Sequence, residues 1–214
     1  MEIKICYIVG AGEFEGDTFS PDPQDYVIAA DGGYAYLQQL HISPDLVVGD
    51  FDSLGTVPEN ETIIKHPVMK DDTDMMLAVK EGFQRGYKTF VIYGGLGGRI
   101  DHAIANIQTL AYISHHGGIG FLSGNHQMIT LITNTSISFD KSVGGIISVF
   151  SNSSCAHGVD LEGLLYPLEN ATLTSNYPLG VSNEFTGREA TVRVKDGSLI
   201  VMWSGDFDKA VLRW

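Results

Sequence analysis

Short apolar runs recur along the chain as far as residue 134, and most end at a glycine or an acidic residue. Apolar runs of this length are typical of strands that are buried on both faces of a sheet. The predicted strands are Ile3–Val9, Tyr26–Ala30, Leu46–Val48, Thr62–Lys65, Thr89–Tyr93, Ile119–Leu122 and Met128–Thr133.

Segments with helical spacing lie between several of these strands. Tyr34–Leu40 is predicted to form a short helix, and a second helix begins at Lys70–Asp74. The second helix has an apolar stripe of Met76, Val79 and Phe83. A third helix is predicted to turn Ile100, Ile104, Ile107 and Ala111 toward the core. The alternation of strand and helix predicts an α/β domain with a mainly parallel sheet over residues 1–134.

The pattern changes near Asn134, after which no long helical period occurs. Short strand-like segments separated by turn residues follow instead, at a spacing typical of a β-sandwich. They are Ser136–Phe139, Ile146–Phe150, Gly158–Leu161, Ala171–Thr174, Gly180–Ser182, Ala190–Val194 and Ser198–Trp203. We therefore expect residues 135–214 to form a second domain, an all-β sandwich.

Composition and charge narrow the classes of partner. The 214 residues are 43% hydrophobic and 18% charged, with a formal net charge of −13. This acidity argues against a nucleic-acid partner or an anionic membrane surface. A polyphosphate substrate would need a bridging cation. Cys6 and Cys155 lie far apart in the sequence, and no signal-peptide or membrane-spanning pattern is present. A reduced, cytoplasmic protein is the expectation.

Two carboxylates follow the strand Leu46–Val48. Asp50 and Asp52 are two residues apart, so on an extended backbone they share one face. At about 4 Å such a pair repels by roughly 4 kcal/mol at an effective dielectric constant of 20. Magnesium, which prefers oxygen ligands, would relieve this repulsion. A polar turn with solvated aspartates explains the same residues equally well.

Further acidic residues stand at two other element boundaries. Asp31 follows a strand and precedes a helix, where ligands bind in open α/β sheets. A helix N-cap is the equally weighted alternative. Lys70-Asp71-Asp72-Thr73-Asp74 opens the second helix, and capping by Asp72 or Thr73 explains only one or two of its acids. The acidic residues that capping does not explain favour a functional role for this segment.

A glycine-rich segment precedes the third helix. Gly94–Gly98 has four glycines in five positions, and Arg99, His102 and Asn106 follow on one helix face. The segment suits a phosphate cradle at a helix N-terminus, with Arg99 as a donor. It lacks the ending of a Walker A loop. A flexible connector and a surface histidine are the alternatives. Gly10-Ala11-Gly12 is a weaker candidate of the same kind, equally explained by a tight turn.

Taken together, these segments resemble the thiamine pyrophosphokinase family. The motifs that carry the resemblance are ADGG at Ala30–Gly33, PDLVVGDFDS at Pro44–Ser53, KDDTD at Lys70–Asp74, GGLGGRIDH at Gly94–His102, GLLYPL at Gly163–Leu168 and SNEF at Ser182–Phe185. They run through nearly the whole chain. GDFDS followed by GGxGGRxDH is the specific combination.

The resemblance implies transfer of pyrophosphate from ATP to the hydroxyl group of thiamine, giving thiamine diphosphate and AMP. It implies a homodimer with active sites at the subunit interface. The implied Mg²⁺ ligands are Asp31, Asp50, Asp52 and Asp74. The implied ATP-binding residues are Asp31, Gly32, Gly33, Thr73, Gly95, Gly98, Arg99, Asp101 and His102. The implied thiamine-binding residues are Lys70, Asp71, Tyr166, Ser182 and Asn183.

The implied catalytic residues are Asp50, Asp52, Asp74 and Arg99. Asp74 or Asp71 is the candidate acceptor for the hydroxyl proton of thiamine. Two positions depart from the family pattern. Lys70 replaces a glutamine, and Tyr166 replaces a tryptophan found in some members.

Two rival functions fit the same residues. A metal-dependent nucleotide phosphohydrolase would use the aspartates with water as the acceptor. A non-catalytic nucleotide or thiamine sensor would bind without turnover.

Overall fold

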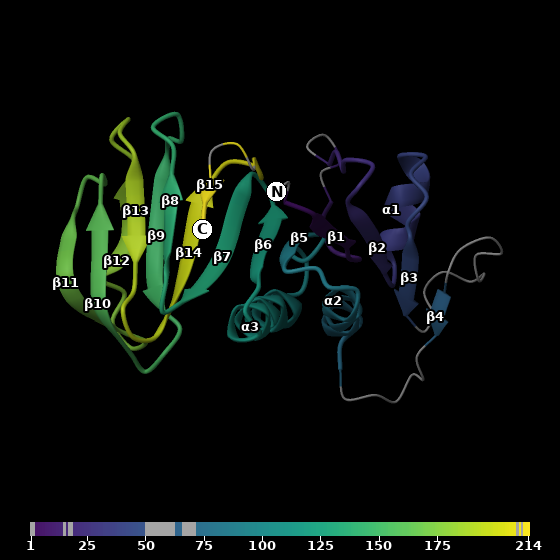
Figure 1. The fold of residues 1–214 in the computed structure, drawn as a ribbon, viewed down its shortest axis with the longest axis horizontal. Helices are drawn as coiled ribbons and strands as arrows, with labels where there is room; N and C mark the ends of the chain where they lie inside the picture. Colours follow the sequence, from purple (N-terminus) through teal and green to yellow (C-terminus); the bar gives the residue numbers. More distant parts are fainter. Residues whose placement is uncertain are drawn as a thin grey trace. The chain divides into compact units, whose positions relative to one another are not determined.

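The computed structural model describes residues 3–14, 16, 19–49, 63–65, 72–208, 210 and 212–214. The chain divides into two compact units, Met1–Asn125 and His126–Trp214 (Figure 1). β7 (Gln127–Thr133), which the sequence analysis assigned to the first domain, lies in the second unit. The reason is its partner: β7 pairs along its full length with β14 (Ser198–Ser204).

The first unit has a parallel strand arrangement. Its strands lie in the order β6-β5-β1-β2-β3-β4, and every pairing between these neighbours is parallel. Their bounds are β1 (Ile5–Val9), β2 (Tyr26–Ala30), β3 (Leu46–Gly49), β4 (Ile63–Lys65), β5 (Thr89–Tyr93) and β6 (Ile119–Gly124). β1, β3 and β5 are fully buried, as their uninterrupted apolar runs predict.

Among the residues that the structure describes, three helices cover the parallel strands. They are α1 (Gly33–Gln39), α2 (Asp74–Gln84) and α3 (Ile100–His115). α2 and α3 lie side by side, and α1 stands apart from them (Figure 1). Right-handed crossovers explain this arrangement. From β1 the chain crosses the sheet toward β2 and β3, with α1 between these two strands. After α2 it returns to β5 on the other side of β1, and it continues through α3 to β6 in the opposite direction across the sheet.

The predicted core face of α3 is wrong. Ile100 and Ile104 are 78% and 54% exposed, whereas the buried residues are Asn106, Thr109, Leu110 and Ile113. Helical spacing identifies several possible stripes, and contact with β6 decides which one is buried. The stripe of α2 differs for the same reason. Its buried residues are Met75, Ala78, Val79 and Gly82, so of the predicted stripe only Val79 is buried.

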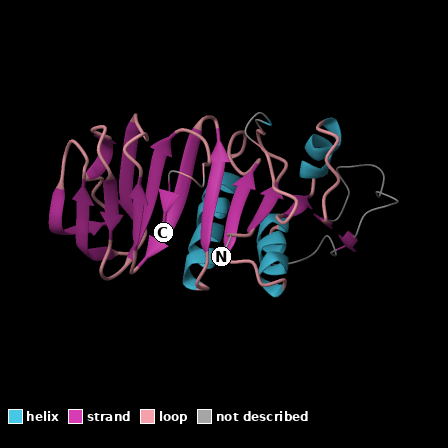
Figure 2. Ribbon diagram, turned by 45° about the horizontal axis from the view of Figure 1, so that its top comes forward, coloured by secondary structure: helices cyan, strands magenta, loops and turns pink. Residues whose placement is uncertain are grey.

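The second unit is built of antiparallel strands, and the described helices are confined to the first unit (Figure 2). One set of strands has the order β12-β9-β14-β7, and the other has the order β11-β10-β13-β8-β15. The remaining bounds are β8 (Ser136–Phe139), β9 (Ile146–Ser151), β10 (Cys155–Glu162), β11 (Leu168–Thr174), β12 (Gly180–Glu184), β13 (Ala190–Arg193) and β15 (Leu212–Arg213).

Aromatic rings join the two sets of strands in the second unit. Phe139 of β8 contacts Trp203 of β14, with ring centroids 5.2 Å apart, and it contacts Phe185 at the same distance.

The all-β character of the second unit agrees with the prediction from the sequence. β15 is not predicted from the sequence, because its two residues are too few to give a pattern.

Candidate functional site

A cavity of about 480 Å³ opens in the first unit, within the size range of small-molecule sites. It lies where β1 and β5 end, the point at which the strand order reverses direction. Open α/β sheets bind ligands at this position. The cavity is lined by Gly10, Ala11, Gly12, Ala30, Asp31, Thr73, Asp74, Met75, Gly94, Gly95, Gly97, Gly98, Arg99, His102, Ala105 and Asn106.

The two glycine-rich loops of the cavity are joined through their backbones. The amide of Gly12 donates to the carbonyl of Gly94 at 2.7 Å, and that of Glu13 donates to Leu96 at 3.0 Å. A Cβ at Gly12 would lie 2.6 Å from the oxygen of Gly94, and a Cβ at Gly94 would lie 2.3 Å from that of Gly10. Glycine is therefore required at both loops for their mutual approach.

Gly95 and Gly98 serve different purposes in the same loop. A Cβ at Gly95 would meet the side chain of Leu122 at 2.5 Å, so this glycine permits close packing beneath the cavity. Gly98 has a φ of +66° and no atom within 4 Å of an added Cβ. Because Gly98 lines the cavity, its missing side chain leaves room for a ligand.

The N-terminus of α3 presents an ion pair. The Nη2 of Arg99 donates to Oδ2 of Asp101 at 2.5 Å, and its Nε donates to Oδ1 at 3.1 Å. The hydrogen bond from Arg99 holds the pKa of the exposed Asp101 below its ordinary value. The guanidinium fork that now pairs with a carboxylate has the geometry that phosphate requires. Arg99 and His102 line the cavity, and Asp101 is not among the lining residues.

Asp31 and Asp74 approach the cavity from different elements. Asp31 follows β2 with a φ of +48°, and its amide donates to the carbonyl of Val48 at 2.8 Å. The N-cap residue of α1 is Gly32, so capping does not explain Asp31. Thr73 caps α2 by accepting a hydrogen bond from the amide of Met76 at 3.2 Å. Asp74 is therefore not needed as a cap, and both aspartates line the same cavity.

The other predicted residues of this region divide into two groups. Gly32 and Gly33 do not line the cavity. A Cβ at Gly33 would lie 1.9 Å from the carbonyl oxygen of Val9, so this glycine lets α1 begin directly against β1. Four predicted residues, Asp50, Asp52, Lys70 and Asp71, lie outside the residues that the structure describes. Across the described ranges, no group of three or more His, Cys, Asp or Glu side chains could hold a metal ion.

Asn106 is a cavity residue that the sequence analysis left out of its binding set. It is buried, lines the cavity, and donates from Nδ2 to the carbonyl oxygen of Gly95 at 2.7 Å. Its position seven residues after Arg99, on the same helix face as His102, was the available signal.

The predicted residues of the second unit lie around β12. Asn183 is 3% exposed, and its amide pairs with the backbone of Tyr166. Its Oδ1 accepts from the amide of Tyr166 at 2.9 Å, and its Nδ2 donates to the carbonyl of Tyr166 at 2.7 Å. The Oδ1 also accepts from the amide of Glu184 at 2.9 Å. Asn183 thus fixes the backbone that carries the Tyr166 ring, which is 63% exposed.

A bulge and several exposed apolar residues lie on or beside the strand that holds the Tyr166 backbone. Ser182 has a φ of +55° at a register shift between β12 and β9, and its amide donates to Oγ of Ser148 at 3.0 Å. Bulges of this kind redirect side chains next to functional sites. We call the exposed apolar residues on or beside β12 the β12 surface; they are Ile146, Leu165, Tyr166, Leu179 and Val181. Exposed apolar groups in one region indicate a binding surface.

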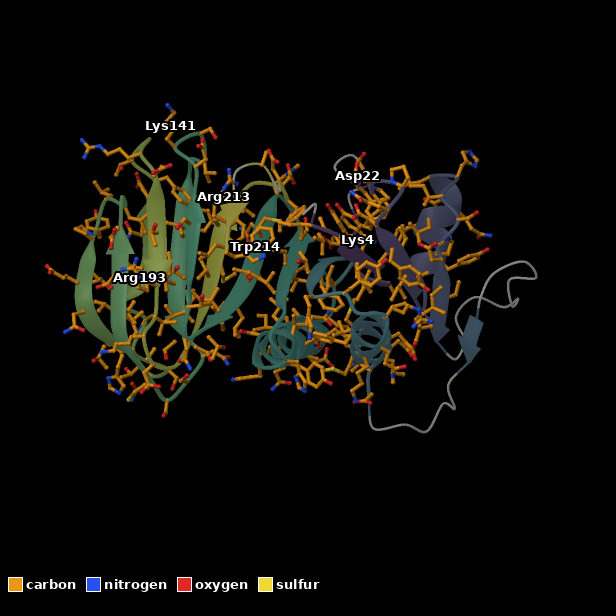
Figure 3. All side chains as sticks on the ribbon, viewed as in Figure 1. Lys4, Asp22, Lys141, Arg193, Arg213 and Trp214 are labelled. Atoms are coloured by element: carbon orange, nitrogen blue, oxygen red, sulfur yellow. The ribbon has the colours of Figure 1, made fainter. Side chains whose placement is uncertain are left out.

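A second cavity, of about 380 Å³, lies in the second unit and is lined by Arg193 and Lys195 among others. The Nη1 of Arg193, labelled in Figure 3, lies 3.5 Å from carboxylate oxygens of both Asp160 and Glu162. Of the predicted site residues that the structure describes, none lines this second cavity.

Family comparisons cover both units. Residues 21–119 match the family described as "Thiamin pyrophosphokinase, catalytic domain". Residues 134–199 match the family described as "Thiamin pyrophosphokinase, vitamin B1 binding domain". Among the described helices, none has the length and apolar character required to cross a membrane.

Individual relatives agree with these matches. The chain is 31% identical over 188 residues to thiamine pyrophosphokinase of Bacillus subtilis, covering 84% of this chain and 87% of the relative. The crystal structure of the Bacillus subtilis protein matches with a TM-score of 0.85 at 26% identity, over 95% of this chain and all of that one. The thiamin pyrophosphokinase structure from Geobacillus thermodenitrificans, at 22% identity, supports the fold with a TM-score of 0.82, over 94% of this chain and 98% of that one.

Proposed function

The chain belongs to the thiamine pyrophosphokinase family, and from that premise we propose that it transfers the pyrophosphoryl group of ATP to the hydroxyl group of thiamine. The products are thiamine diphosphate and AMP. The observation that carries the proposal is the cavity at the ends of β1 and β5. There Asp31 and Asp74 line the same space as Gly98 and Arg99.

This arrangement suits the charge of a nucleotide tail. The N-terminus of α3, with Gly98 beside it, offers backbone amides and room for phosphate oxygens. Arg99 supplies a planar cation that exchanges its Asp101 partner for phosphate and shares the charge that develops during transfer. Transfer of this kind depends on positioning and charge neutralisation more than on covalent help from the protein.

Magnesium fits the acidic side of the cavity. Asp31 and Asp74 offer the hard oxygen ligands that the ion prefers, and Asp50 and Asp52 complete the proposed set. When bound, the ion would neutralise phosphate charge between the aspartates and ATP. Asp74 or Asp71 is the proposed acceptor of the thiamine hydroxyl proton, and Thr73, Gly95 and His102 complete the proposed ATP site.

The second unit supplies the proposed acceptor site. Tyr166 exposes a flat ring on which a cationic heterocycle can stack, and Asn183 holds the backbone that carries this ring. Ser182, Lys70 and Asp71 are the other proposed thiamine contacts. The packed strands of this unit support the β-sandwich assignment, with residues 135–214 proposed to bind thiamine and residues 1–134 to bind ATP.

Exposed apolar residues support a homodimer with active sites at the subunit interface. The β12 surface in the second unit and Ile100 and Ile104 on α3 are regions that a second copy could cover. Both cysteines are free, which supports a cytoplasmic protein.

Product analysis tests the function. Purified protein is incubated with ATP and Mg²⁺, with and without thiamine, and nucleotides and thiamine esters are separated by chromatography. AMP and thiamine diphosphate should appear in equal amounts, and only when thiamine is present. Phosphate release that ignores thiamine would establish the phosphohydrolase instead. Binding of ATP or thiamine without any product would establish the sensor.

A further inference from the structure

Asn106 lies within the proposed ATP cavity, two helical turns after Arg99. Seven residues of α-helix span about 10 Å, so Asn106 and Arg99 mark separated parts of the cavity lining. Only 7% of Asn106 is exposed. It is therefore a polar side chain almost removed from water, yet in contact with the space where a ligand would lie.

The orientation of the Asn106 amide follows from its contact with Gly95. A backbone carbonyl only accepts hydrogen bonds, so the NH₂ end of the amide must face Gly95, at 2.7 Å. The oxygen, Oδ1, then lies at the opposite end of the amide. Within the described part of the chain, no residue donates a hydrogen bond to this oxygen.

A buried acceptor without a donor destabilises the protein, so such groups are normally paired. A ligand in the cavity can supply the missing donor. In ATP the phosphate oxygens accept hydrogen bonds, while the donors are the ribose hydroxyls and the 6-amino group of adenine. Asn106 therefore matches the nucleoside part of ATP rather than its phosphate tail.

We propose that Oδ1 of Asn106 accepts a hydrogen bond from the nucleoside of the bound nucleotide. The nucleoside then lies toward Asn106, and the phosphates lie toward Gly98 and Arg99. Contact with Gly95 fixes the amide, so that the oxygen is presented in one orientation. This inference rests on the proposed function, because it takes ATP as the ligand of the cavity.

Calorimetric titration of the full chain tests the proposal. The probes are the Mg²⁺ complexes of ATP, 2′-deoxy-ATP, 3′-deoxy-ATP and purine riboside triphosphate, which lacks the 6-amino group. Thiamine is left out, so that no transfer occurs. One analogue should bind the wild-type protein about tenfold more weakly than ATP. In Asn106→Leu the ratio between ATP and that analogue should fall to near one.

Thr109→Val is the matched control. Thr109 is buried on the same helix and donates to the carbonyl of Ala105 at 3.0 Å, but it does not line the cavity. The ratio between ATP and the sensitive analogue should therefore stay at its wild-type value in this variant. If Asn106→Leu does not fold, Asn106→Ala removes the same oxygen without adding an apolar side chain.

Two results would overturn the proposal. In the first, no analogue binds the wild-type protein more weakly than ATP. In the second, the ratios are the same in the wild-type protein and in the Asn106 variants, which would leave Asn106 with the structural contact to Gly95 alone. Failure of the wild-type protein to bind ATP at all would contradict the proposed function itself.

Discussion

Each unit contains a buried asparagine that holds the backbone of a loop, and the two differ in what the amide has left to offer. Asn183 in the second unit uses its oxygen and its NH₂ group on the backbone of Tyr166. Asn106 in the first unit uses its NH₂ group on Gly95 and lines a cavity. The first unit thus forms its site from loops at strand ends, whereas the second displays one ring from the loop between β10 and β11, beside the bulged strand β12. An asparagine that is fully paired positions another residue, and one that is half paired can also contact a ligand.

The largest expected effect is a loss of kcat when a carboxylate of the first unit's cavity is removed. Asp74→Asn removes a carboxylate of the cavity but keeps its shape, so we expect kcat to fall by at least about 100-fold. Steady-state assays of AMP formation measure it. Asp72→Asn is the control, because Asp72 pairs with Lys80 at 2.6 Å and does not line the cavity. Equal losses in both variants would remove Asp74 from the site.

Two glycines of one loop test how the first unit is built. Gly94→Ala would force a Cβ to within 2.3 Å of Gly10, so we expect it to lower the free energy of unfolding by about 2 kcal/mol or more. Gly98→Ala meets only the cost of its positive φ, roughly 1 kcal/mol, and should instead raise the KM for ATP because it fills cavity space. Denaturant titration and steady-state kinetics measure the two effects. If Gly94→Ala raised the KM for ATP and Gly98→Ala lowered the free energy of unfolding by the larger amount, the ligand would lie against Gly94 instead.

Because Asn183 is proposed to position Tyr166, substituting it should change the KM for thiamine and leave the KM for ATP unchanged. Asn183→Asp loses the donor to the carbonyl of Tyr166, so the ring shifts and the KM for thiamine should rise about tenfold. The KM for ATP should not change.

The double variant Asn183→Asp, Tyr166→Ala should have nearly the same KM for thiamine as Tyr166→Ala alone, because both substitutions remove the same ring contact. Asn176→Asp, at an exposed turn of the same unit, is the control. Additive losses would mean that Asn183 contacts thiamine directly.

The smallest effect concerns the two cysteines, one in each unit. Burial raises the pKa of the Cys6 thiol, so at neutral pH it stays protonated and unreactive. Cys155 is exposed. Iodoacetamide should therefore modify Cys155 rapidly, and Cys6 only after denaturant unfolds the first unit. Mass spectrometry of the labelled peptides checks this. Rapid labelling of Cys6 in the native protein would contradict the burial of β1.

The sequence predicted the strands of the first unit well, because a strand buried on both faces leaves an uninterrupted apolar run. It failed on α3, where Ile100 looks like a core residue and is exposed. It treated Gly94 and Gly98 alike, since only the folded backbone shows that one contacts Gly10 and the other faces open space.

Among the site residues, Asp31 and Asp74 line one cavity, as their places at strand and helix boundaries suggested. The role of Asn183 could not be read from the sequence, because its partner Tyr166 lies 17 residues away. The placement of Asp50 and Asp52 stays a prediction.

The fate of the β-phosphorus of ATP distinguishes pyrophosphoryl transfer from transfer of a single phosphoryl group. ATP labelled at that phosphorus is incubated with the protein, Mg²⁺ and thiamine, and the products are separated. Pyrophosphoryl transfer predicts that all converted label is in thiamine diphosphate and that the AMP carries none. Label in ADP, with thiamine monophosphate or free phosphate as the other product, would rule out pyrophosphoryl transfer.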